Sequence, residues 1–174
     1  MIANIDALIR DSLSSLTGEV RALGWSGQRE REVVSLFCFG HLLTHCKKGT
    51  VLYDPKQVAI EVAVPQVADQ VNISGKHQSK LQVCKDIVIW PRPRMTCWDA
   101  AGQPTVKPMC IIEWKHNEDS ESQYDVAWMH QFSAAAESFV GYAVLTKQRE
   151  VREFQLSCSR IYRGEAQSRW LSME

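Results

Sequence analysis

Apolar positions along the chain switch between helical spacing and short continuous runs, a pattern that predicts both helices and strands. Residues 2–23 carry apolar side chains three and four positions apart: Ile5, Leu8, Ile9, Leu13 and Leu16. Residues 28–46 hold too many apolar side chains for a single stripe, so we expect a second, well-buried helix there. The acids in its first turn suit the positive end of a helix dipole.

Strand signals dominate the middle of the chain. Compact apolar runs bounded by prolines, glycines or polar residues predict strands at 58–64, 81–90, 109–115 and 139–145. The last of these runs is apolar throughout, as in a strand that is buried on both faces. A helix is expected over 124–138. A final strand is expected around 154–158, a short strand and turn at 51–55, and a loop or hairpin at 66–79.

This order of elements predicts an α/β fold with a central mixed sheet of four to five strands, flanked by helices. The strands at 81–90 and 109–115 should be antiparallel neighbours, because only a short excursion links them. The length of 174 residues suits one domain over 1–174. Within it we expect an N-terminal helical extension (1–26), a core (27–147) and a C-terminal strand and tail (148–174).

Charge is distributed unevenly along a chain whose formal net charge is zero. Between Lys76 and Lys115 there are seven basic residues and three acids, whereas 116–139 holds five acids and no lysine or arginine. A neutral total argues against a protein coated in basic residues. It leaves room for a local basic face that contacts nucleic acid.

Cysteine usage and the absence of long apolar stretches predict a cytoplasmic protein without a membrane span. None of the six cysteines forms a C-x-x-C pair, and Cys38, Cys84 and Cys110 sit within apolar runs, so buried reduced thiols are expected. The N-terminal segment carries Asp6 and Asp11 and has no long apolar core, so no secretory signal is expected.

The candidate chemistry centres on Glu113 and Lys115 in the predicted strand 109–115. Two positions apart on a strand, they point to the same face, and the side chain of Trp114 points to the other. Asp86 is set into the neighbouring apolar run. Two carboxylates on adjacent strands would suit a divalent metal ion with oxygen ligands, with a basic group beside it. The alternative is a surface ion pair between Glu113 and Lys115.

These residues resemble the PD-(D/E)xK nuclease superfamily, also called restriction-endonuclease-like, which has an αβββαβ core. The match comprises an acid in an early helix, Glu30, an acid in one strand, Asp86, and the E-x-K triplet Glu113-Trp114-Lys115. The segment 27–34 is similar to the helix start of archaeal Holliday-junction resolvases, which favours Glu30 over Glu32. The helix 124–138 would supply Gln131.

Two departures from the family pattern are visible. The residue before Asp86 is Lys85 rather than the proline that names the motif, although many members lack that proline. Position 135, four residues after Gln131, is alanine rather than the tyrosine of the RecB-like branch. Neither departure removes a metal ligand.

The resemblance implies a DNA endonuclease that depends on Mg²⁺ or Mn²⁺ and acts on duplex or branched DNA. Asp86 and Glu113 would hold the metal ion with the carbonyl oxygen of Trp114, and Glu30 would bind a metal-bound water or a second ion. Lys115 would orient the attacking water or stabilise the phosphate, with Gln131 as a supporting contact. Such enzymes often pair to cut both strands, so a homodimer is one expected assembly. The alternative is a catalytically inactive domain of this fold that binds DNA or a protein partner.

Other motifs give weaker indications. His41 and His45, four residues apart and followed by Cys46, could begin a zinc site, although a packed pair is far more common. Basic residues outside the triplet could hold phosphates or simply be solvated: Lys76, Lys80, Arg92 and Arg94. Three tryptophans could stack on bases but more often fill a core: Trp90, Trp98 and Trp114.

Overall fold

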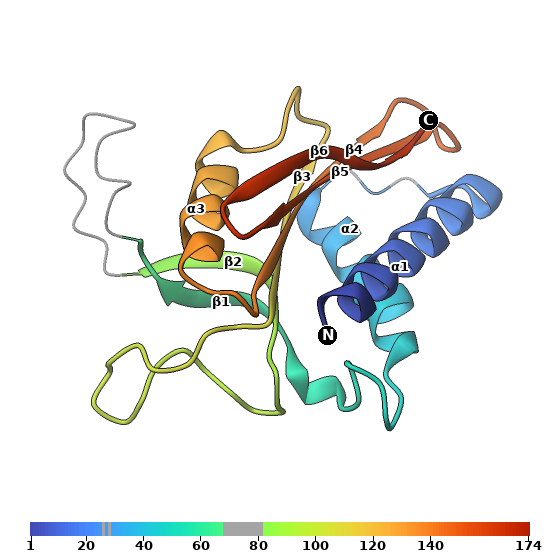
Figure 1. Cartoon of the computed structure of the whole chain (residues 1–174). Coiled ribbons are helices and arrows are strands. Elements are labelled where there is room, and N and C mark those ends of the chain that lie inside the picture. The colour runs from blue at the N-terminus through green and yellow to red at the C-terminus, as the bar shows by residue number, and fades with distance from the viewer. Residues whose placement is uncertain (26, 28, 68–81) are drawn as a thin grey trace.

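The computed structural model of the chain describes residues 1–25, 27, 29–67 and 82–174 (Figure 1). The predicted loop at 66–79 lies almost entirely outside the described residues. So do Gln28 and Leu81, at the starts of two predicted elements, and the two lysines Lys76 and Lys80.

A six-stranded mixed sheet forms the centre of the molecule. Its strands lie in sequence order: β1 (Val58–Pro65), β2 (Gln82–Ile89), β3 (Cys110–His116), β4 (Val140–Gln148), β5 (Phe154–Tyr162) and β6 (Glu165–Met173). β3 runs parallel to β4, and the other neighbours are antiparallel. The predicted α/β class with a mixed sheet is confirmed, as is the antiparallel pairing of β2 with β3.

The number of strands differs from the expected four to five. The segment 154–158 continues as a strand to Tyr162, and a tight turn at Arg163 and Gly164 returns the chain as β6. The expected C-terminal strand and tail (148–174) thus holds two strands of the sheet, β5 and β6. Because the side chains of β6 are mostly exposed or half-buried, its segment lacks the apolar run that marks a strand in sequence.

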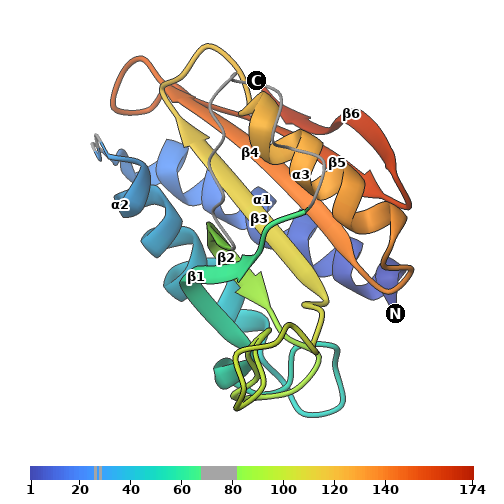
Figure 2. The ribbon, with the colours of Figure 1, turned by 90° about the vertical axis from the view of Figure 1, so that its left-hand side faces the viewer.

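Helices cover both faces of the sheet. On one face lie α1 (Ile2–Leu23) and α2 (Glu30–Ser35), and on the other lies α3 (Gln123–Ala134), as Figures 1 and 2 show from two sides. α1 was expected as an extension, but its apolar stripe is fully packed into the core: Ile5, Ile9, Leu13 and Leu16 are all 0% exposed. The elements from α2 to β4 follow the order α, β, β, β, α, β.

The second predicted helix is not uniform. After α2 the chain continues as a π-helical segment, η1 (Leu36–Leu42), and ends in a short 3-10 turn, η2 (Leu43–His45). The predicted strand at 51–55 is not present. A second 3-10 turn, η3 (Pro55–Gln57), follows instead, because Asp54 caps it and Pro55 suits its first position.

The sheet opens between β2 and β3. Their register covers only three residue pairs, from Ile87↔Ile112 to Ile89↔Cys110, and β1 and β2 then continue together as a separate arm (Figure 1). Where the opening begins, Glu61 of β1 adopts a left-handed backbone conformation, with φ of 53°. Glu61 and Asp86, which would face each other in a regular pairing of β1 with β2, are not paired. A non-glycine residue in this conformation is uncommon.

At this point the side chains of both strands of the arm exchange the faces of the sheet to which they point. Val58 and Ile60 pack in the cluster beneath α1 and α2, whereas Val62 and Val64 pack in the cluster beneath α3. Residues two apart on a regular strand would share a face. Asp86 therefore lies at the point where β2 changes face and leaves β3.

All six cysteines are free. Four of them are buried, but Cys84, which was expected in the core, is exposed because it lies on the arm. Among the described residues, no helix combines the length and the apolar character that crossing a bilayer would require.

Two phenylalanines on η1 provide a test of this packing. Phe37 is 0% exposed, and its ring lies 5.1 Å from that of Trp114, whereas Phe39 is 63% exposed. Phe37→Ala should lower the free energy of unfolding by about 3 to 5 kcal/mol, and Phe39→Ala by less than about 0.5 kcal/mol. Urea denaturation with an unchanged m-value measures both. Equal losses would contradict the placement of η1.

Candidate functional site

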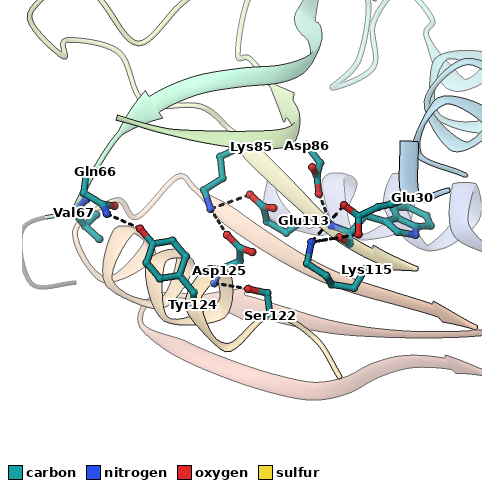
Figure 3. Close-up of polar contacts among 11 residues, drawn as sticks. Glu30, Gln66, Val67, Lys85, Asp86, Glu113, Lys115, Ser122, Tyr124 and Asp125 are labelled. Carbon is teal, nitrogen blue, oxygen red and sulfur yellow. Dashed lines mark hydrogen bonds and ion pairs between the residues drawn. The ribbon is translucent and has the colours of Figure 1, made fainter. Parts of the chain in front are cut away.

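The predicted acids of β2 and β3 meet at the opening of the sheet (Figure 3). There the backbone N–H of Trp114 donates a hydrogen bond of 2.8 Å to Oδ2 of Asp86. If β2 and β3 stayed paired here, a backbone carbonyl of β2 would accept this hydrogen bond. The Asp86 carboxylate accepts it instead, so the Trp114 N–H is not left without a partner. Asp86 also lines a cavity of about 300 Å³ with Glu30, Arg31, Val34, Ser35, Ile60, Glu61 and Cys84.

Glu113 is buried, at 6% exposure, and its partner is Lys85. Lys85 Nζ lies 2.9 Å from Glu113 Oε1 and 2.8 Å from Asp125 Oδ1 on α3 (Figure 3). It also lies 4.6 Å from the centre of the Trp128 ring. The alternative of a surface ion pair between Glu113 and Lys115 is therefore wrong. Each residue has a different partner.

Lys115 reaches across the opening to the helix on the other face of the sheet. Its Nζ lies 3.3 Å from Glu30 Oε2 and donates a hydrogen bond of 2.9 Å to its neighbour's carbonyl oxygen, Trp114 O. Of the two candidate acids in α2, the structure brings Glu30 to this cluster. Glu32 accepts a hydrogen bond from the backbone N–H of Arg29 at the start of the helix.

The E-x-K strand alternates as predicted. Ile111 packs in the cluster beneath α3, and the side chains of Cys110, Ile112 and Trp114 pack in the cluster beneath α1 and α2. The indole of Trp114 is fully buried, and its Nε1 donates to Thr146 Oγ1. Only the backbone of Trp114 therefore belongs to the site.

Burial governs the ionisation of the acids. It raises the pKa of Glu113 to about 8, despite the ion pair with Lys85, and nearby Asp125 and Asp86 raise that pKa further. Burial also raises the pKa of Asp86 and of Glu30, although Trp114 N–H and Lys115 oppose the rise at Asp86. For Lys85, burial lowers the pKa, but the pairs with Glu113 and Asp125 outweigh it, so the pKa is raised.

The donor set of the site is small for a divalent cation. In the parts of the chain that the structure describes, no group of three or more His, Cys, Asp or Glu side chains is arranged to hold a metal ion. The site does offer two adjacent carboxylates, Asp86 and Glu113, and the carbonyl of Trp114. Glu113 Oε1 lies 2.9 Å from Lys85 Nζ, so a cation would meet the other oxygen of this carboxylate. Mg²⁺ commonly binds through one or two carboxylates and keeps several waters, so these residues fit such an ion.

Gln131 is not brought to this cluster. It lines a separate cavity of about 720 Å³ between α3 and strands β5 and β6, with Glu121, His130 and Ser159. Gln131 lies six residues after Asp125, so the two leave a helix in different directions. Asp125, in the first turn of α3, is the residue of this helix that contacts the site.

The remaining candidates lie elsewhere. Arg92 and Arg94 are exposed in the loop that follows the far end of β2 and do not line the cavity with Asp86. Trp90 is 1% exposed and belongs to the core. His41 is buried, with its Nδ1 2.9 Å from Ser15 Oγ, as expected for a packed histidine.

Two residues of the cluster were missed in the sequence. In the sequence, Lys85 shows only a departure from a motif, and Asp125 is one of the five acids between residues 116 and 139. The signal for them in the sequence is the uneven distribution of charge: Lys85 lies in the basic segment 76–115, and Asp125 lies in the acidic segment 116–139. That signal does not identify which lysine meets which acid.

Neither a family model, nor a curated protein, nor a solved structure matches this chain.

The raised pKa of Glu113 makes a prediction about stability. The folded protein holds this proton up to about pH 8, whereas the ordinary pKa is 4.5. Between these two pH values the folded protein therefore binds more protons than the unfolded chain does. The free energy of unfolding should fall as pH rises from about 4.5 to about 8. Glu113→Gln should remove this part of the pH dependence.

Denaturation in metal-free buffer across this pH range, in wild type and variant, measures the difference. Glu118→Gln, at an exposed position, is the matched control and should leave the slope unchanged. A wild-type slope that persists in Glu113→Gln would contradict the assignment.

Proposed function

We propose that the chain is a metal-dependent nuclease of the PD-(D/E)xK superfamily that hydrolyses phosphodiester bonds in DNA. The observation that carries this proposal is the convergence of Glu30, Asp86, Glu113 and Lys115 at one opening of the sheet, although they come from three separate elements. The order of elements from α2 to β4 matches the αβββαβ core of that superfamily. DNA, duplex or branched, is the proposed partner. A homodimer and a cytoplasmic location stay predictions.

In this proposal, Asp86, Glu113 and the carbonyl of Trp114 would hold Mg²⁺ or Mn²⁺. The bound ion would supply Lewis-acid chemistry, which makes nearby water more acidic and offsets the charge of the phosphate. Lys115 holds an ammonium group beside these ligands, where it can donate hydrogen bonds to the attacking water or to a phosphate oxygen. Glu30 keeps that ammonium group at the opening through its ion pair.

A second candidate is a catalytically inactive domain of this fold that binds DNA or a protein partner. One observation favours it: Lys85 already supplies a positive charge to Glu113, one of the two proposed metal ligands. The zero net charge also favours a weaker contact with DNA. Metal-dependent cutting separates the two candidates.

The test is cleavage of supercoiled plasmid, linear duplex, branched duplex and single strands with Mg²⁺, Mn²⁺ or EDTA. Wild type should cut in the presence of either metal ion and not in EDTA. Asp86→Asn, Glu113→Gln and Lys115→Met should each lower the rate at least about a hundredfold, because each removes a group that acts on the reacting charges. Gel electrophoresis of timed samples gives the rates.

Gln131→Ala is the matched control. Gln131 lines the other cavity, so the variant should cut at the wild-type rate. DNA binding without cutting under both metals would favour the inactive domain. Cutting at the wild-type rate in Glu113→Gln would overturn the proposed site.

A further inference from the structure

Lys85 is an unusual residue for the position it occupies. Its side chain is 0% exposed, enclosed by the strand that carries Glu113 and by the helix that carries Asp125 and Trp128. A buried ammonium group is costly unless it is paired. Here it has two carboxylates within 2.9 Å and an aromatic face 4.6 Å away. The surroundings therefore hold a cation at a fixed place beside Glu113.

The charges of the cluster divide into two halves. Lys115 lies against Glu30 on the side of α2, and Lys85 lies between Glu113 and Asp125 on the side of α3. Once a bound cation displaces the proton of Glu113, four carboxylates face two ammonium groups, so two negative charges remain. The nearby Arg31 and Glu61 pair with each other and do not change this sum. One divalent cation at Asp86 and Glu113 balances this remainder, and a second would leave the site positive.

We propose that Lys85 takes the place of a second cation on Glu113, so that the site binds a single divalent ion per chain. This inference rests on the proposed function, because it assumes that Asp86 and Glu113 are metal ligands. Lys85 is then a positioning residue: it holds one oxygen of Glu113 and leaves the other side of the carboxylate to face Asp86. It also weakens metal binding, because its charge repels an ion on the same carboxylate.

Titration of the full chain with Mn²⁺, followed by the electron paramagnetic resonance signal of free Mn²⁺, counts the ions without any need for activity. Wild type should bind one Mn²⁺ per chain, Mg²⁺ should compete for it, and Asp86→Asn should abolish it. Two ions per chain in wild type would overturn the single-ion stoichiometry. No binding in wild type would overturn the proposed function as well.

The role of Lys85 is tested by a charge-removing and a charge-keeping variant. Lys85→Met should bind Mn²⁺ about tenfold or more tightly than wild type, since a repulsive charge is gone. Lys85→Arg should stay close to wild type. Unchanged affinity in Lys85→Met would overturn the role of Lys85 while leaving the nuclease proposal in place.

A second comparison covers the case in which Lys85→Met alone does not fold, as judged by circular dichroism. Asp125→Asn removes the second acid that pairs with Lys85. The double variant Lys85→Met with Asp125→Asn therefore leaves fewer unpaired buried charges than Lys85→Met alone. The double variant should bind Mn²⁺ about tenfold or more tightly than Asp125→Asn alone. Equal affinity in this pair would overturn the proposal in the same way.

Discussion

The hydrogen bond from Trp114 N–H to Asp86 marks the place on which the rest of the site depends. At this point β2 leaves β3, and a side-chain carboxylate replaces the carbonyl that would have continued the ladder. The opening gives Lys115 a route to Glu30 on the other face of the sheet. A regular sheet would keep these groups on opposite sides. The left-handed backbone at Glu61 lies beside this opening, where both strands of the arm turn over.

Around the opening, buried charge is stabilised by pairing across elements. The basic segment supplies Lys85 and Lys115, and the acidic segment supplies Asp125, so two regions that are unbalanced in sequence become neighbours in space. Removal of one partner from such a pair leaves the other charge buried, which costs more than the pair contributes. Pairing does not fully offset the cost of burial at Glu113, because burial raises the pKa of its carboxyl even though Lys85 lies beside it. A carboxylate in that condition is suited to a cation that can replace its proton.

The packing around the opening explains why the site can be precise. β3 and β4 are buried on both faces, so the E-x-K strand is held by helices from either side. Phe37 packs against Trp114 from η1, and Trp128 packs against Lys85 from α3. The charged groups of Glu113 and Lys115 thus project from a strand that is packed on both faces. A site of this kind keeps its geometry without support from loops.

The sequence by itself determined the α/β class, the order of elements from α2 to β4, the antiparallel pairing of β2 with β3, and the alternation that separates Trp114 from Glu113 and Lys115. These follow from periodicity and short connections, which are local properties. Only the tertiary structure decided the partners of each charge, the exclusion of Gln131, the inclusion of Asp125, and β6 as a strand. Those outcomes depend on where β2 and β3 separate and on which side of α3 faces the sheet. Contacts between residues far apart in the chain set both, and no local pattern encodes them.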